Sequence, residues 1–344
     1  MFKKDAFKKI GISILTLLLL TLLLLFIFRD NMADFYQAFR SLSVPDIVCL
    51  VGMGAANQLL DALVCFRLIR NVLPTVRYGH ALTVIYLGVF GNVSTFSAGT
   101  IPMQAYYLHR RGVEVGHGIG IMTLQYLLHK TSIVLFSTIM LIAGGKWLYA
   151  AYPDIHGFII AGYIICAAVV GILVLLCTWD RAHRAAMWLI GKFPDRGKWK
   201  LRAEKIGRQL DHLFLETKAG LKRKDTLLFA FFVNIVKLGI FCAVPYVCMR
   251  ILGRDMLGIL QVELLTSLML LISNAVPNVA GIGPKEIVFW LLYRPLLGDA
   301  LASSSLLFFR ITTYYLPFLI SIFVFLAVQM RLVSKGKNEE EEQS

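Results

Sequence analysis

The chain has 344 residues, of which 58% are hydrophobic and only 16% are charged, and its formal net charge is +14. A soluble domain carries about a quarter charged residues, so the composition excludes an ordinary soluble enzyme. Several apolar runs reach the roughly 20 residues that a helix needs to cross a bilayer. We therefore expect an all-α polytopic membrane protein.

The positive charge does not indicate nucleic acid as a partner. The basic residues gather in a few loops beside apolar runs, as topology signals and contacts with anionic lipid do. No basic-aromatic module for nucleic acid is present. The six cysteines form no CxxC or Cys/His cluster, and phosphate-loop, HExxH and GxSxG patterns are absent. We expect packing cysteines, no metal site and no cofactor.

In chain order, a basic N-terminus precedes a long apolar run over residues 10–28. No small-residue cleavage site follows this run, which predicts a retained first span rather than a signal peptide. Hydropathy predicts five further spans, at residues 45–66, 118–143, 157–178, 226–249 and 300–330.

Two apolar regions, 79–112 and 256–297, do not fit simple spans. Each has a first arm, a break rich in Gly, Pro, Ser or Asn, and a short second arm, which is Pro102–Arg111 or Pro284–Leu297. Helices of these lengths span about 15 to 21 Å, less than the roughly 30 Å hydrocarbon core. The sequence favours two re-entrant hairpins and leaves ten full spans as the alternative. The predicted hinge residues are Gly99, Pro102, Pro277, Gly281, Gly283 and Pro284.

The distribution of Lys and Arg predicts the sides of the membrane. It places both termini and the basic loop 180–225 in the cytoplasm. Residues 1–156 and 157–332 then follow the same plan in opposite orientation, which is an inverted-topology repeat. We expect about six full spans, the two hairpins, and a disordered acidic tail over 333–344. Apolar positions in the basic loop fit an interfacial helix or a solvated connector equally well.

Ionisable residues at membrane depth are costly and are therefore candidates for function. Six such residues occur in the apolar segments: Lys130, Lys237, Glu263, Lys285, Glu286 and Arg310. Their surplus of cations suits an anionic ligand. Arg310 is the strongest candidate, because it lies deep in the last span and its guanidinium can grip phosphate or carboxylate. Internal pairing of Glu263 or Glu286 with Arg310 is the open alternative.

The two breaks suggest how an anion could be held. Helices that begin near Pro284 and Pro102 would point unpaired N–H groups and positive dipole ends at the membrane centre. Two facing ends of this kind make a seat for a lipid phosphate, and packing kinks are the alternative. His129 can titrate near neutral pH or act as a polar packing contact. Three polar residues of the second span are expected at the same cavity: Asn57, Gln58 and Asp61.

Three segments resemble one known family. PNVAGIGPKE (277–286), GTIPMQAYYLHRRGV (99–113) and LFFRITTYYLP (307–317) are similar, in the same order, to segments of the lysylphosphatidylglycerol synthase transmembrane region. That region is the flippase-like half of the bacterial multiple peptide resistance factor, and this chain resembles its stand-alone form. The resemblance adds Gln104 to the candidate site. It implies a multi-pass protein of the bacterial plasma membrane that moves anionic or aminoacylated phospholipid between leaflets.

Two functions therefore stand open. The first is a flippase for lipids of the phosphatidylglycerol or lysylphosphatidylglycerol class. The second is a membrane-embedded transferase with Glu263 or Glu286 as its base. Full-length members of the family add a large soluble domain that transfers lysine, so we expect no lysyltransferase activity from this polypeptide alone. The expected partners are anionic phospholipids and no nucleic acid, with a separate lipid synthase and a homo-oligomer left open.

Overall fold

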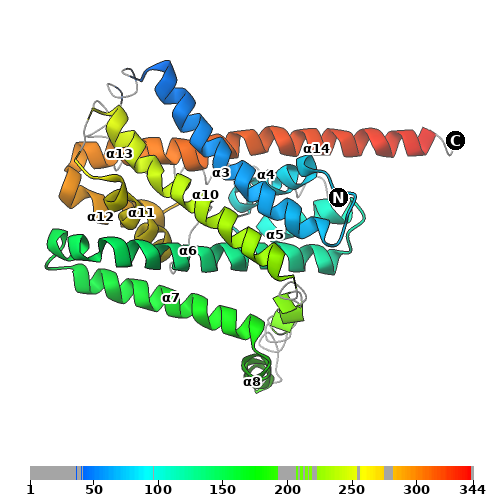
Figure 1. The fold of residues 1–344 in the computed structure, drawn as a ribbon. Helices are drawn as coiled ribbons and strands as arrows, with labels where there is room; N and C mark the ends of the chain where they lie inside the picture. Colours follow the sequence, from blue (N-terminus) through cyan, green and yellow to red (C-terminus); the bar gives the residue numbers. More distant parts are fainter. Residues whose placement is uncertain are drawn as a thin grey trace.

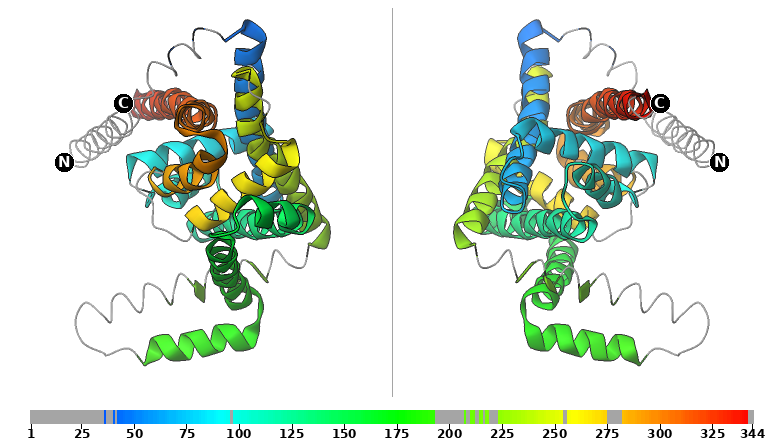
Figure 2. Two further views of the ribbon diagram at one scale, coloured as in Figure 1. Left: turned by 90° about the vertical axis from the view of Figure 1, so that its left-hand side faces the viewer. Right: turned by 90° about the vertical axis from the view of Figure 1, so that its right-hand side faces the viewer.

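The computed structural model (Figures 1 and 2) describes residues 42–95, 97–192, 223–253, 256–274 and 282–341, with isolated residues 36, 40, 207, 210, 211, 214, 215, 217 and 218. For 331–341 only the backbone is described.

The first half of the described chain contains two long helices separated by two short ones. They are α3 (Val44–Arg70), α4 (Tyr78–Ser94), α5 (Thr100–His109) and α6 (Val115–Ala151). Two helices then lead into the second half, α7 (His156–Thr178) and α8 (Asp180–Gly191).

The second half repeats this order of long, short, short and long helices. Its elements are α10 (Lys224–Ile251), α11 (Ile259–Ser273), α12 (Pro284–Leu297), α13 (Asp299–Arg310), the π-helical turn η2 (Ile311–Tyr315) and α14 (Leu316–Glu341). The last three run on as one long helix (Figure 1). This repetition supports the predicted inverted repeat, whose opposite orientation in the membrane stays a prediction.

Among the described residues, five helical segments are long and apolar enough to cross a membrane. They are Val44–Arg70, Val115–Ala151, His156–Thr178, Lys224–Ile251 and Asp299–Met330. Each contains one of the five predicted later spans, which confirms those spans by length and composition. The predicted first span lies outside the described residues. The chain is also helical to Glu341, where the sequence predicts a disordered tail, because Lys and Glu are good helix formers that extend the span.

The four short helices form two hairpins at opposite ends of the bundle. Figure 1 shows α4 and α5 toward one end and α11 and α12 toward the other. Their lengths of 17, 10, 15 and 14 residues correspond to about 26, 15, 22 and 21 Å, short of a hydrocarbon core of about 30 Å. This arrangement is the one that re-entrant hairpins require, and their passage into the membrane remains a proposal.

The breaks begin new helices at or near the predicted residues. Gly283 precedes α12 with φ of +109°, a conformation that favours glycine, and Pro284 is the first residue of the helix. Gly99 is the N-cap of α5, so Pro102 lies in that helix's first turn. The other two predicted hinge residues, Pro277 and Gly281, lie outside the described residues.

The long helices α3 and α10 lie side by side and run antiparallel (Figures 1 and 2). Helix α3 also approaches η2 closely at Gly54. A Cβ atom at this position would stand 2.6 Å from the Thr312 backbone carbonyl oxygen. The absence of a side chain at Gly54 therefore permits the contact between the first half of the chain and the last span.

Helix α8 runs across the direction of the long helices, since it is seen end-on in Figure 1 and lengthwise in Figure 2. One face is covered by the chain that follows: His183 stacks on Phe214 and bonds Asp211 across 2.8 Å. The other face exposes basic and aromatic residues, namely Arg181, Arg184, Trp188 and Lys192. Basic residues beside tryptophan are typical of a helix at an anionic membrane surface.

Replacement of Gly54 by alanine should destabilise the protein by about 1–3 kcal/mol, because the new methyl group meets a backbone carbonyl that cannot move aside alone. Gly52→Ala on the same helix is the matched control, since a Cβ atom there meets nothing within 4 Å. It should be neutral or stabilising by up to about 1 kcal/mol. Thermal unfolding in detergent, followed with a thiol-reactive dye on the buried cysteines, measures both changes, and equal melting temperatures would contradict the packing argument.

The exposed face of α8 should lie at the lipid headgroups. Anionic lipids brominated near the headgroup should quench the fluorescence of Trp188, which is the part of the tryptophan fluorescence that the Trp188→Phe variant lacks. High salt should weaken this quenching. Trp290→Phe, on α12 at the opposite end of the bundle, is the control variant. Equal quenching of wild type and Trp188→Phe would favour the solvated-connector alternative for this segment.

Candidate functional site

Charged residues of four helices come together at the middle of the bundle. Lys237 lies about 20 Å from the start of the 28-residue helix α10, and Lys130 lies near the middle of the 37-residue helix α6. The N-terminus of α12 brings Lys285 and Glu286 to the same region, where the Lys285 charge interacts with those of Lys130 and Arg310. The structure therefore brings together most of the predicted ionisable residues.

Lys237 is held in a buried polar cluster between α3, α6 and α10. Its side chain is 2% exposed, and its Nζ atom lies 2.7 Å from Asp61 Oδ1 and 3.2 Å from His129 Nδ1. Gln125 donates to the Asp61 backbone carbonyl at 3.3 Å. An unpaired ammonium at this depth would be very costly, so Asp61 is the residue that makes a buried lysine tolerable here.

Lys130 points toward the break of the second hairpin. Its ammonium donates to Asn274 Oδ1, at the C-cap of α11, and stands 5.0 Å from the centre of the Tyr126 ring. Lys285, at the start of α12, is partly exposed and bonds no carboxylate among the described residues. These two lysines are therefore cations at mid-depth that no described carboxylate neutralises through an ion pair.

Arg310 and Glu286 form a buried ion pair, with side-chain exposures of 5% and 4%. The other carboxylate oxygen of Glu286 accepts from the Gly283 backbone N–H at 2.7 Å, which closes the first turn of α12. Internal pairing, the open alternative for these residues, is thus what the structure shows for Glu286. Arg310 joins the start of α12 to the end of α13, so its first role is to hold the two ends together.

The π-helical turn η2 begins directly after Arg310. A π-turn inserts a bulge into a helix and occurs frequently at functional sites. It places Tyr314 with its ring centre 5.1 Å from the Arg310 guanidinium carbon. The last span is consequently irregular at the level where the ion pair and the hairpin break meet.

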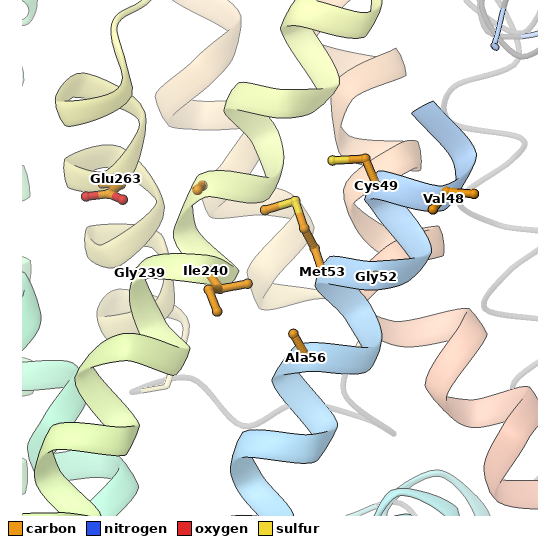
Figure 3. Close-up of a pocket in the computed structure, with 9 residues that line it drawn as sticks. Val48, Cys49, Gly52, Met53, Ala56, Gly239, Ile240 and Glu263 are labelled. Atoms are coloured by element: carbon orange, nitrogen blue, oxygen red, sulfur yellow. The ribbon is translucent and has the colours of Figure 1, made fainter. Parts of the chain in front are cut away.

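Glu263 lies apart from the central charges. It lines a pocket of about 540 Å³ between α3 and α10, whose other walls are Val48, Cys49, Gly52, Met53, Ala56, Gly239, Ile240 and Ala243 (Figure 3). These walls are apolar and mostly small, so the pocket suits hydrocarbon more than a headgroup. Pairing of Glu263 with Arg310, which the sequence left open, does not occur in the structure.

Gln104 packs within the first hairpin instead of facing the central lysines. Its Nε2 atom donates to the Val84 backbone carbonyl at 3.3 Å, and its side chain lies directly over Gly88. A Cβ atom at Gly88 would stand 2.4 Å from Gln104 Nε2. The observed role of Gln104 is therefore to hold α5 against α4, and its binding role stays a prediction.

The sequence reasoning missed Asn274 and Asn234. Asn274 accepts a hydrogen bond from the Lys130 ammonium. Asn234 lies beside His129, and its side chain is 1% exposed. An asparagine one turn from a buried lysine, as in NIVK, was the available signal for the second. No group of three or more His, Cys, Asp or Glu side chains suited to a metal occurs within the part of the chain that the structure describes.

Residues 13–321 match the lysylphosphatidylglycerol synthase TM region. The chain belongs to this family. The match spans both hairpins and all the central charged residues, and it agrees with the resemblance seen in three separate segments. Among curated proteins, no relative matches. The family identifies a lipid-related protein with several membrane-spanning helices.

Loss of the buried ion pair should be strongly destabilising. Glu286→Gln keeps an oxygen for the Gly283 N–H but leaves the Arg310 guanidinium without its carboxylate, which should cost about 3–5 kcal/mol. Thermal unfolding with the thiol-reactive dye measures this loss, with Glu114→Gln, an exposed carboxylate, as control. The double variant Glu286→Gln/Arg310→Met should recover part of the stability, and failure of the single variant to destabilise would refute the pairing.

Proposed function

We propose that the protein moves an anionic or aminoacylated phospholipid of the phosphatidylglycerol or lysylphosphatidylglycerol class between the leaflets of a bacterial plasma membrane. The observation that carries this proposal is the pair Lys130 and Lys285, two lysines at mid-depth that form no ion pair with a described carboxylate. Charged side chains at this depth commonly mark the path of a substrate. Both candidate lipids share a phosphodiester, which is the group that two cations would recognise.

The start of α12 adds a second attraction for phosphate. The first N–H groups of a helix lack intrahelical partners and carry partial positive charge, and Lys285 is the second residue of α12. The N–H of Gly283, the residue before the helix, already donates a hydrogen bond to the Glu286 carboxylate. The remaining first-turn N–H groups and the two lysines together favour a monoanionic headgroup over a neutral one.

The two hairpins supply a route for movement. In transporters with inverted repeats, broken helices from the two halves meet at the substrate site, and one half rocks against the other. The hairpins at opposite ends of this bundle fit that design. The apolar pocket beside Glu263 lies between one long helix of each half, where an acyl chain could remain in hydrocarbon during the movement of its headgroup.

The proposed orientation follows from the charge at the two ends of the bundle. The end that carries α8 also carries the C-terminus of α3 and the N-terminus of α10 (Figure 1). Basic residues are dense there, including Arg70, Arg77, Arg110, Arg111, Arg223 and Lys224. The positive-inside rule places this end in the cytoplasm, where the distribution of Lys and Arg in the sequence also predicts both chain termini.

The geometry favours transport over the transferase alternative. Both carboxylate oxygens of Glu286 are engaged, one by Arg310 and the other by the Gly283 N–H. A general base needs a free carboxylate within reach of the proton that it removes. Glu263 is not engaged in this way, but it faces an apolar pocket away from the lysines that would hold the phosphate.

Lys130→Gln and Lys285→Gln should each slow the movement of fluorescent phosphatidylglycerol in proteoliposomes by about tenfold or more, because each removes one charge-assisted contact with phosphate. Lys146→Gln is the matched control, since Lys146 lies on the same helix as Lys130 and is exposed. It should leave the rate unchanged.

The measurement counts dithionite-protected lipid over time, first with phosphatidylglycerol and then with lysylphosphatidylglycerol. Equal rates in folded wild type and folded lysine variants would remove the two lysines from the site. Movement of neither lipid by folded wild type would contradict the proposed function.

A further inference from the structure

The Asp61–Lys237–His129 cluster contains a histidine whose protonation state its partners determine. The charged Lys237 ammonium has only donors, so the His129 Nδ1 atom, 3.2 Å away, accepts. His129 is then neutral and carries its proton on Nε2. The ammonium keeps Asp61 as its second partner at 2.7 Å.

The surroundings of the imidazole are predominantly cationic. Lys237 faces it from α10, Lys130 is its neighbour on α6, and Lys285 approaches from α12. Asp61 on α3 is the nearby carboxylate and is already bonded to Lys237. The sequences of α5 and α7 contain no Asp, Glu, Lys or Arg. From the end of α11, the neutral Asn274 contacts Lys130, and Glu263 of α11 lines the separate apolar pocket. Arg310 of α13 is paired with Glu286.

A negative charge placed between Lys130 and Lys285 would cancel part of this positive field. The same anion would therefore favour protonation of His129, which stands next to Lys130 in the chain. Thermodynamic linkage makes the effect reciprocal, so protonation of His129 would tighten the binding of the anion. A proton on Nδ1 cannot face the Lys237 ammonium, so the hydrogen bond between Lys237 of α10 and His129 of α6 must break as the proton binds.

We propose that the central site takes up a proton together with its anionic ligand, and that His129 is the residue that receives the proton. This inference rests on the proposed function, because it needs an anion at the two lysines. The proton moves from water to the Nδ1 lone pair, and no covalent bond of the ligand changes. Phosphatidylglycerol, with one negative charge, and one proton together carry no net charge, so a difference in pH across the membrane can drive their joint movement.

The test is calorimetric binding of dihexanoyl-phosphatidylglycerol to the full-length protein in detergent, near pH 7.5, in buffers of different ionisation enthalpy. The dependence of the observed heat on the buffer gives the number of protons taken up. Wild type should take up protons as the lipid binds, because an anion that favours the protonated site must bind together with protons. His129→Gln should take up almost none and bind more weakly.

His117→Gln is the matched control, a histidine near the start of the same helix with an exposed side chain. It should behave as wild type does. A thiol-dye melt verifies that each variant is folded. The wild-type measurement alone tests whether a proton is taken up with the lipid, and the comparison with folded His129→Gln tests whether His129 receives it.

The outcomes separate this inference from the proposed function. Binding of the lipid by wild type without proton uptake, or equal uptake by folded His129→Gln, overturns the proton site and leaves lipid binding standing. No binding of the lipid by folded wild type removes the anion site and the proton site together. Uptake that disappears only in His129→Gln supports both.

Discussion

The buried ion pair between Glu286 and Arg310 is the interaction on which the central region depends. It ties the first turn of α12 to the end of α13, and Glu286 also closes that turn through the Gly283 N–H. Arg310 and Glu286 are almost fully buried, so either charge without the other would be costly, and the two residues hold each other in place. The break of the second hairpin and the π-turn of the last span are positioned around this pair.

The pairing also decides which charges remain for a ligand. Arg310 forms an ion pair with Glu286, and Lys237 forms one with Asp61, so these two carboxylates already neutralise other cations. Among the described residues, Lys130 donates to the amide oxygen of Asn274 and lies over the Tyr126 ring, and neither Lys130 nor Lys285 bonds a carboxylate. The positive surplus that the composition indicated is thus located at two specific side chains beside the start of a helix.

A second consequence concerns how the halves of the chain are joined. Lys237 belongs to the second half, while Asp61 and His129 belong to the first, and α3 meets η2 through Gly54. A movement of one half against the other must change these contacts. A histidine in such a contact gives the movement a natural dependence on protonation, since its two nitrogen atoms accept or donate according to charge.

The sequence alone determined the helical membrane class, the five later spans, the positions of both breaks and the family, because hydropathy, Pro and Gly act locally along the chain. It also identified the charged residues near the centre. It could not show the structural roles of such residues: Arg310, favoured for the ligand, pairs with Glu286, and the neutral Gln104 bonds α5 to α4, while their binding roles stay predictions. These roles depend on partners separated by 24 residues for Arg310 and Glu286, 144 for Lys130 and Asn274, and 176 for Lys237 and Asp61. Only the packing of the helices brings such partners together, and so only the tertiary structure decided which charges are neutralised and which are left to bind.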